Sequence, residues 1–229
     1  PEITGSIVNV DMAMKNGFLW KKGPFEMLDD LGPSWFAAKV SEEGLQVPHL
    51  LEKVGEDKFY KVEGKDVLYF STELKYAKLV KPEGYLTASD VKRGQDPKFS
   101  NPSASLWDMG DDILLIEFHS KMNSMDPLIM EAITEAVDLC EKGNFQGVVI
   151  GNDGTNFSAG ANLGLSTFVA NVGAWDEAEK FVFGGQVAFM MLKHGNFPVV
   201  GAPSGLAIGG GCEVLLACDS IQAHSESYI

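Results

Sequence analysis

The sequence of 229 residues is short of cysteine and of positive charge. Its three cysteines, Cys140, Cys212 and Cys218, form no CxxC pair, which excludes a disulfide scaffold. Lys and Arg number 18 against 32 Asp and Glu, so the net charge of −14 disfavours nucleic-acid binding. No apolar run is long enough to span a bilayer, and the amino terminus lacks the pattern of a signal peptide. We therefore expect a cytoplasmic protein without a nucleic-acid partner or membrane span.

Several familiar site motifs are also missing. The sequence contains neither GxGxxG nor GxxxxGK[ST], the glycine-rich motifs that bind dinucleotides and nucleotide phosphates. Ser158 lies in Asn-Phe-Ser-Ala-Gly, which does not match the serine-hydrolase motif GxSxG. The 4 histidines and the cysteines show no metal-ligand spacing, so no metal site is predicted.

The charge that is present divides the chain into two parts. Residues 1–105 carry 14 basic and 16 acidic groups, whereas residues 106–229 carry 4 basic and 16 acidic groups. The stretch 95–103 is rich in Pro, Ser and Asn, which is typical of a linker. We predict two domains, residues 1–100 and residues 106–229. Because the sequence begins with Pro1 and stops at Tyr228-Ile229 within a stretch predicted to be structured, we expect a piece of a longer polypeptide.

The first part is predicted to be mainly helical. Asp11 is a candidate N-cap for a helix that begins at Met12, and Pro24 suits the first turn of the next helix. Apolar residues at helical spacing indicate a further helix over 45–54, after one capped by Ser34. The segments 58–62 and 66–70 form a candidate β-hairpin.

The second part alternates strands with helices. Candidate strands cover 113–118, 147–151, 198–202 and 220–223. Helices are expected after the N-cap Asp126, from Asp176 to about residue 192, and after Gly209-Gly210-Gly211. This alternation predicts an α/β fold with a mainly parallel sheet.

Two glycine-rich turns, 156–163 and 205–213, each follow a predicted buried strand. Small residues let backbone N–H groups approach a ligand, and the second turn lies at the start of a helix, where unpaired N–H groups attract negative charge. Two such groups directed at one point would form an oxyanion hole. The pattern is equally compatible with glycines that only turn the chain between strand and helix.

Residues 106–229 resemble the amino-terminal part of the crotonase (enoyl-CoA hydratase/isomerase) superfamily. The resemblance is carried by Phe157-Ser158-Ala159-Gly160-Ala161-Asn162-Leu163 and by 198–219, especially Gly209-Gly210-Gly211-Cys212-Glu213. It implies an incomplete crotonase-like (ClpP/crotonase) β-β-α core. It also implies that the amides of Ala161 and Gly210 hold an acyl-CoA thioester oxygen, and that the backbone from Ser158 to Leu163, with Ala159, Gly160 and Asn162, lies along the CoA adenine.

In this resemblance Glu213 matches the first catalytic glutamate of hydratases. Its alternative role is that of an acidic residue which only complements the helix dipole. The second glutamate of hydratases would follow the last residue, and Glu226 comes too early to replace it. The few lysines of the second part do not favour binding of the CoA phosphates. Lys121, just after the first predicted strand, is the best candidate for such a contact.

Residues 11–32, with the run Gly-Pro-Phe-Glu-Met-Leu-Asp-Asp-Leu-Gly, resemble the helical carboxy-terminal domain of 3-hydroxyacyl-CoA dehydrogenases. Together the resemblances imply a piece of a bacterial multifunctional fatty-acid oxidation protein, in which NAD would bind only an upstream domain. We expect the piece to bind acyl-CoA and to be nearly inactive alone, and the intact protein to hydrate 2-enoyl-CoA, with homo-oligomerisation left open. An enoyl-CoA isomerase and a non-catalytic CoA-binding or assembly module remain alternatives.

Overall fold

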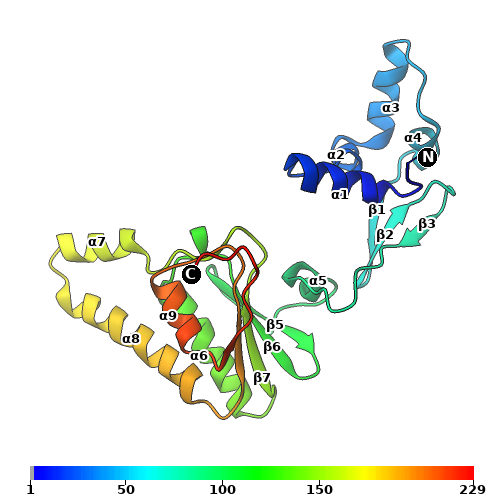
Figure 1. Cartoon of the computed structure of the whole chain (residues 1–229). Helices are drawn as coiled ribbons and strands as arrows, with labels where there is room; N and C mark the ends of the chain where they lie inside the picture. Colours follow the sequence, from blue (N-terminus) through cyan, green and yellow to red (C-terminus); the bar gives the residue numbers. More distant parts are fainter. Residues whose placement is uncertain (1–2) are drawn as a thin grey trace. The chain divides into compact units, whose positions relative to one another are not determined.

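The computed structural model describes residues 3–229 and divides into two compact units. The first unit comprises residues Pro1–Tyr85 and the second comprises Leu86–Ile229 (Figure 1). This boundary lies closer to the amino terminus than the linker expected at 95–103, which belongs to the second unit. The predicted limits of 100 and 106 thus differ from the boundary between the compact units, because β4 and the start of β5 pair within the sheet of the second unit.

The first unit joins four helices to a small antiparallel sheet. The helices are α1 (Ile7–Phe18), α2 (Pro24–Leu31), α3 (Pro33–Glu42) and α4 (His49–Val54). The strands β1 (Tyr60–Glu63), β2 (Asp66–Phe70) and β3 (Tyr76–Lys78) follow, and β1 pairs with β2 as the expected hairpin. Helix α4 is shorter than the predicted 45–54, since Pro48 precedes its first residue and fixes the start.

The prediction that Asp11 caps its own helix was wrong. Asp11 lies inside α1, is buried, and accepts hydrogen bonds from the backbone N–H of Phe25 (2.9 Å) and the hydroxyl of Tyr60 (2.7 Å). Its carboxylate thus serves the first turn of α2, where backbone N–H groups have no acceptor within the helix. Asp11 therefore ties α1 to both α2 and β1.

The second unit is built on a six-stranded sheet with strand order β11-β9-β7-β6-β5-β4. The strands β6 (Ile113–Phe118), β7 (Gly147–Gly151), β9 (Val199–Ala202) and β11 (Ser220–Ile221) are parallel, as predicted. Strands β5 (Ala104–Gly110) and β4 (Phe99–Ser100) add an antiparallel edge that was not predicted. The sheet is therefore mixed, with its parallel part at the centre.

Helices cover both faces of this sheet. Buried side chains of α6 (Pro127–Glu141), α8 (Trp175–His194) and α9 (Gly210–Leu216) share one apolar core with Leu114, Ile116 and Val148 of the strands. The short helix α5 (Ala88–Lys92) packs on the opposite face against Leu115. This layering is visible in Figure 1, where α6, α8 and α9 lie on one side of the strands. It explains why the central strands are apolar on both faces.

Two further strands and one helix lie beside the main sheet. Strand β8 (Asn156–Ser158) pairs in parallel with β10 (Leu206–Ala207), and each precedes one of the glycine-rich turns. Helix α7 (Leu163–Asn171) follows the first of these turns and was not predicted. Pairing of β8 with β10 brings the two turns together although about 50 residues separate them in the chain.

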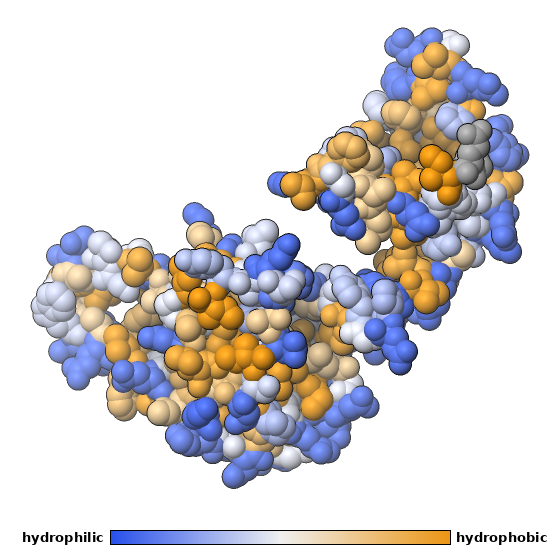
Figure 2. Space-filling view, in the orientation of Figure 1, coloured by the Kyte–Doolittle hydropathy of each residue, from blue (hydrophilic) through white to orange (hydrophobic). Residues whose placement is uncertain are grey.

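Apolar side chains remain on the surface of the second unit. Figure 2 shows them gathered on the face that carries α6, α8 and α9. On α8 the exposed large apolar residues are Trp175, Val182, Phe183, Val187 and Met190. Within residues 3–229 no helix combines the length and hydropathy needed to cross a membrane.

Candidate oxyanion site

The first glycine-rich turn begins at Ser158, at the end of β8. Ser158 is 0% exposed, donates a hydrogen bond from Oγ to the carbonyl of Asn123 (2.6 Å) and accepts one from the N–H of Gly160 (3.2 Å). Gly160 has a φ of +84°, and a side chain there would lie 2.8 Å from the carbonyl oxygen of Ile208. The turn therefore needs glycine both for its backbone conformation and for its close approach to the second turn.

The segment that follows β6 forms the second wall of this turn. It contains the short helix η1 (Lys121–Asn123), and the carbonyl of Met122 accepts a hydrogen bond from the N–H of Ala159 (3.1 Å). Met125 then donates to the carbonyl of Gly160 (2.8 Å) and accepts from the N–H of Asn162 (2.9 Å). These bonds hold the backbone on both sides of Ala161.

The N–H group of Ala161 is left without an acceptor. The β-bridge between Ala161 and Met125 is formed by the carbonyl of Gly160 and the N–H of Asn162, the residues on either side of Ala161. The N–H of Ala161 itself donates no hydrogen bond within residues 3–229. A backbone N–H without an acceptor in the protein can donate to water or to a ligand. Ala161 itself is exposed, so this donor is accessible.

The second turn contains another backbone N–H group without an acceptor, and this group lies near Ala161. Gly209 has a φ of +53°, and Gly210 is the first residue of α9, where the N–H has no partner within the helix. Its amide also makes no hydrogen bond in the described part of the chain. A methyl group on Gly210 would lie 3.4 Å from the nitrogen of Ala161. The two predicted donors are thus brought side by side.

Helix α9 approaches the first turn closely because its second residue is also glycine. A side chain on Gly211 would lie 2.6 Å from the carbonyl oxygen of Ser158, closer than real contacts allow. The glycines at 209–211 therefore do more than turn the chain. They let the first residues of α9 lie against the turn that carries Ala161, and the role of the two amides as an oxyanion hole stays a prediction.

Glu213 lies one turn of α9 after Gly209, and its backbone N–H donates to the carbonyl of Gly209 (3.0 Å). Its side chain is exposed and has no ion pair or hydrogen bond among residues 3–229. The carboxylate is therefore available to a water molecule or a substrate. Cys218, which follows α9, is buried, and burial raises the pKa of its thiol to about 11, so it is a poor nucleophile at neutral pH.

The remaining predicted site residues lie around the same turn. Lys121 is exposed at the start of η1, a segment bonded to β8 through the side chain of Asn123 (2.8 Å to the carbonyl of Asn156). Asn162 caps α7 by accepting a hydrogen bond from the N–H of Leu165 (3.2 Å), as expected for this residue type. Ala159 is half-buried, whereas Leu163 is 74% exposed. Contacts of any of these residues, or of Ser158, with CoA stay predictions.

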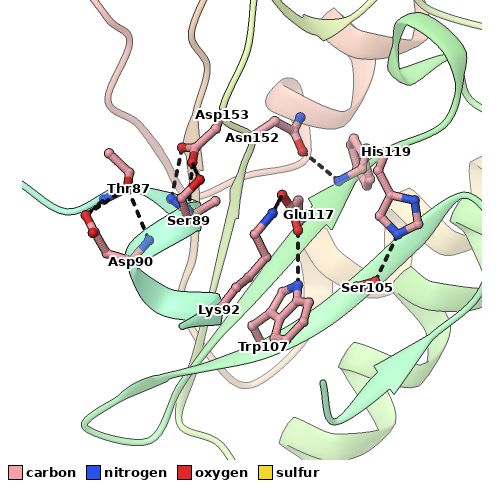
Figure 3. A network of polar contacts seen from close by, with 12 residues as sticks. Thr87, Ser89, Asp90, Lys92, Ser105, Trp107, Glu117, His119, Asn152 and Asp153 are labelled. Atoms are coloured by element: carbon pink, nitrogen blue, oxygen red, sulfur yellow. Dashed lines mark hydrogen bonds and ion pairs between the residues drawn. The ribbon is translucent and has the colours of Figure 1, made fainter. Parts of the chain in front are cut away.

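Sequence reasoning missed two residues that shape the site, Met125 and Asn152. Asn152 accepts a hydrogen bond from the N–H of Phe118 (2.6 Å) and donates one to the carbonyl of Phe157 (2.9 Å). Figure 3 shows its side chain reaching toward the end of β6, near His119. It thereby joins the segment that leads to Met125 with the strand that leads to Ser158. Neither residue belongs to a motif that would have identified it.

No cluster of three or more His, Cys, Asp or Glu side chains suited to a metal ion occurs in the described range, residues 3–229.

Comparison with known proteins adds independent information. Residues 108–229 match the family model described as enoyl-CoA hydratase/isomerase. A Bacillus subtilis protein named "Probable 3-hydroxyacyl-CoA dehydrogenase" is 37% identical over 232 residues, which cover 100% of this chain and 29% of that protein. A Rickettsia felis protein, provisionally named a fatty acid oxidation complex trifunctional enzyme, is 26% identical over 226 residues, with 99% and 29% covered. The chain thus spans less than a third of the length of these relatives.

Solved structures agree on the fold. The crystal structure of an enoyl-CoA hydratase from Bacillus anthracis matches with a TM-score of 0.50 and 23% identity, covering 55% of this chain and 48% of that one. At this level of identity the match concerns the arrangement of helices and strands.

Proposed function

Because the chain belongs to the enoyl-CoA hydratase/isomerase family, we propose that its second unit binds acyl-CoA and takes part in the hydration of 2-enoyl-CoA. The observation that carries the proposal is the pair of unpaired amides, Ala161 and Gly210, held side by side by two separate turns. The family model that matches residues 108–229 supports the same chemistry.

The proposed reaction places negative charge on the thioester oxygen. Addition of hydroxide to C3 of the 2-enoyl group moves the π electrons toward the carbonyl and gives an enolate. The N–H groups of Ala161 and Gly210 donate to this oxygen, and the loss of one such donor raises the barrier by about 3–4 kcal/mol in comparable sites. The proton that C2 then accepts completes the addition of water.

Glu213 is proposed to take the proton from the attacking water. Its free carboxylate lies on the same helix as the Gly210 donor, one turn further along. The family resemblance also implies a second glutamate, on the strand-loop unit that follows in the intact protein. Glu226 comes too early in the sequence to match it.

The whole protein is proposed to couple two consecutive reactions. Hydration yields a 3-hydroxyacyl-CoA, the substrate of the dehydrogenase whose carboxy-terminal domain residues 11–32 resemble. NAD would bind outside this sequence, since the sequence contains no GxGxxG motif. The cytoplasmic location, the homo-oligomeric state and the assignment of the first unit to that dehydrogenase domain stay predictions.

The proposal is tested by hydration of crotonyl-CoA in the full-length protein that contains this chain. We expect Glu213→Gln to lower kcat by about a hundredfold or more, because a positioned proton acceptor contributes this much, with KM little changed. Glu226→Gln is the matched control and should retain the turnover of the unmodified protein. Equal turnover of Glu213→Gln and the control would refute the role of Glu213.

The two alternatives give different results in the same protein. Conversion of 3-enoyl-CoA to 2-enoyl-CoA without hydration would identify an isomerase. Binding of crotonyl-CoA without any turnover would identify a non-catalytic module.

A further inference from the structure

We propose that Ser158 is a positioning residue whose hydroxyl holds the Ala161 amide beside the Gly210 amide. This inference rests on the proposed function and adds a residue that acts on the oxyanion donors without touching the substrate. It differs from the expectation that Ser158 contacts CoA, since the residue is 0% exposed in this structure.

The hydroxyl of Ser158 is used as donor and as acceptor at once. It donates to the carbonyl of Asn123 (2.6 Å) and accepts from the N–H of Gly160 (3.2 Å), the residue directly before Ala161. Asn123 is in turn fixed by its own side chain, which donates to the carbonyl of Asn156 (2.8 Å). The hydroxyl therefore adds two hydrogen bonds to the backbone bonds of Met122 and Met125 that also join the turn to this segment.

The backbone of Ser158 holds the second donor. Its carbonyl oxygen accepts a hydrogen bond from the N–H of Ile208 (3.1 Å), two residues before Gly210. The same carbonyl would lie 2.6 Å from a side chain on Gly211, so α9 rests directly on this residue. Ser158 thus contacts both turns of the site, one through its hydroxyl and the other through its carbonyl.

Removal of the hydroxyl would leave two backbone groups without partners. Gly160 is buried and Asn123 is half-buried, so water does not readily replace the lost bonds. The turn can then regain a hydrogen bond only by moving, and that motion carries the N–H of Ala161 with it. Because an oxyanion donor acts only when aimed at the developing charge, a small displacement lowers the rate more than it lowers substrate affinity.

The experiment compares Ser158→Ala, Ser158→Cys and Ser105→Ala in the full-length protein with crotonyl-CoA. Ser105 is the matched control, because it is also a buried serine whose hydroxyl is hydrogen-bonded, to Ser100 and to His119 (2.9 Å each). We expect Ser158→Ala to lower kcat by roughly tenfold to a hundredfold with nearly unchanged KM. Ser158→Cys, with a weak donor of similar size, should recover part of the loss, and Ser105→Ala should keep the original kcat.

Hydrogen exchange of the peptide spanning residues 156–165 provides a second measurement that needs no catalysis. This peptide should exchange faster in Ser158→Ala than in Ser105→Ala at equal global stability. Unchanged exchange, or equal losses of kcat in Ser158→Ala and the control, would overturn the positioning role. If Ser158→Ala does not fold, the same two measurements on Ser158→Cys decide the question. If the unmodified protein does not hydrate crotonyl-CoA, the proposed function fails, and the exchange data still decide on Ser158.

Discussion

Two glycines with similar backbone conformation show what the first turn requires. Gly160 has a φ of +84° and Gly173 a φ of +68°, a region that side chains rarely adopt. A side chain on Gly160 would lie 2.8 Å from the carbonyl oxygen of Ile208, whereas nothing lies within 4 Å of one on Gly173. The backbone conformation therefore favours glycine at both positions, whereas lack of space for a side chain requires glycine only at Gly160.

We expect Gly160→Ala to lower the free energy of unfolding more than Gly173→Ala. The left-handed conformation alone should cost about 1–2 kcal/mol in each variant. The contact with Ile208 should add roughly 1–3 kcal/mol in Gly160→Ala, because the two turns must move apart. Urea unfolding of both variants measures the difference, and equal losses would show that the turns do not press on each other here.

At the scale of single residues, the sequence led to a prediction of the two amide donors, but not of the hydrogen bonds that hold their turns in place. Ala161, Gly210 and Glu213 were identified through a family resemblance, and the structure brings the two amides together. The hydrogen bonds of Ser158 to Asn123 and of Asn152 to Phe118 join residues 35 and 34 positions apart. No local pattern encodes such bonds, since they depend on how β6 and β8 are placed by the rest of the fold.

Helix α5 shows how a short element depends on its surroundings. Its five residues are too few for a helix that is stable by itself. Figure 3 shows that Asp153, which follows β7, accepts hydrogen bonds from its first turn, at Ala88 (2.9 Å) and Ser89 (2.7 Å). At its other end Lys92 forms an ion pair with Glu117 of β6 (2.6 Å). Both ends of α5 are thus fixed by the sheet on which it packs.

Asp153→Ala should therefore destabilise the second unit through α5. We expect a loss of about 1–2 kcal/mol, because the variant removes the acceptor for two N–H groups of the first turn. Asp176→Ala is the matched control, since Asp176 lies in the first turn of α8 and makes no side-chain hydrogen bond among residues 3–229. Thermal unfolding with hydrogen exchange of residues 86–93 measures both effects. A loss no greater than that of Asp176→Ala would show that Asp153 does not hold α5.

Helices and strands whose apolar residues follow a clear pattern were predicted well, and elements without such a pattern were missed. Strands β6 and β7 have continuous apolar runs, and α6 combines an apolar stripe with the N-cap Asp126 (2.9 Å from the N–H of Ile129). Helix α7 has no buried residue, so its sequence lacks the apolar stripe that identifies a helix. Strand β5 mixes Ser, Asp and Gly with apolar residues, and its identity depends on pairing with β6.

For the whole chain, composition and packing place the domain boundary differently. The change in charge occurs near residue 105, whereas the compact units separate after Tyr85. The stretch 95–103 has the composition of a linker, yet its strand β4 pairs with β5, and Ala88 and Val91 just before it pack against Leu115. Composition reports how polar a segment is, and it does not report which distant strand the segment will join.

The boundary is tested by comparing polypeptides of residues 86–229, 95–229 and 106–229. Removal of residues up to 105 deletes α5, β4 and the start of β5, and leaves Glu117, which is 7% exposed, without its partner Lys92. We expect the free energy of unfolding of 106–229 to be lower than that of 86–229 by about 2–4 kcal/mol. This loss is somewhat smaller than the cost of breaking a fully buried ion pair, because Lys92 is partly exposed. The polypeptide 95–229 retains β4 and lacks α5, so its stability should fall between the two. Circular dichroism during thermal unfolding measures all three. Equal midpoints for 86–229 and 106–229 would mean that residues 86–105 do not stabilise the second unit, as the linker composition of 95–103 indicates.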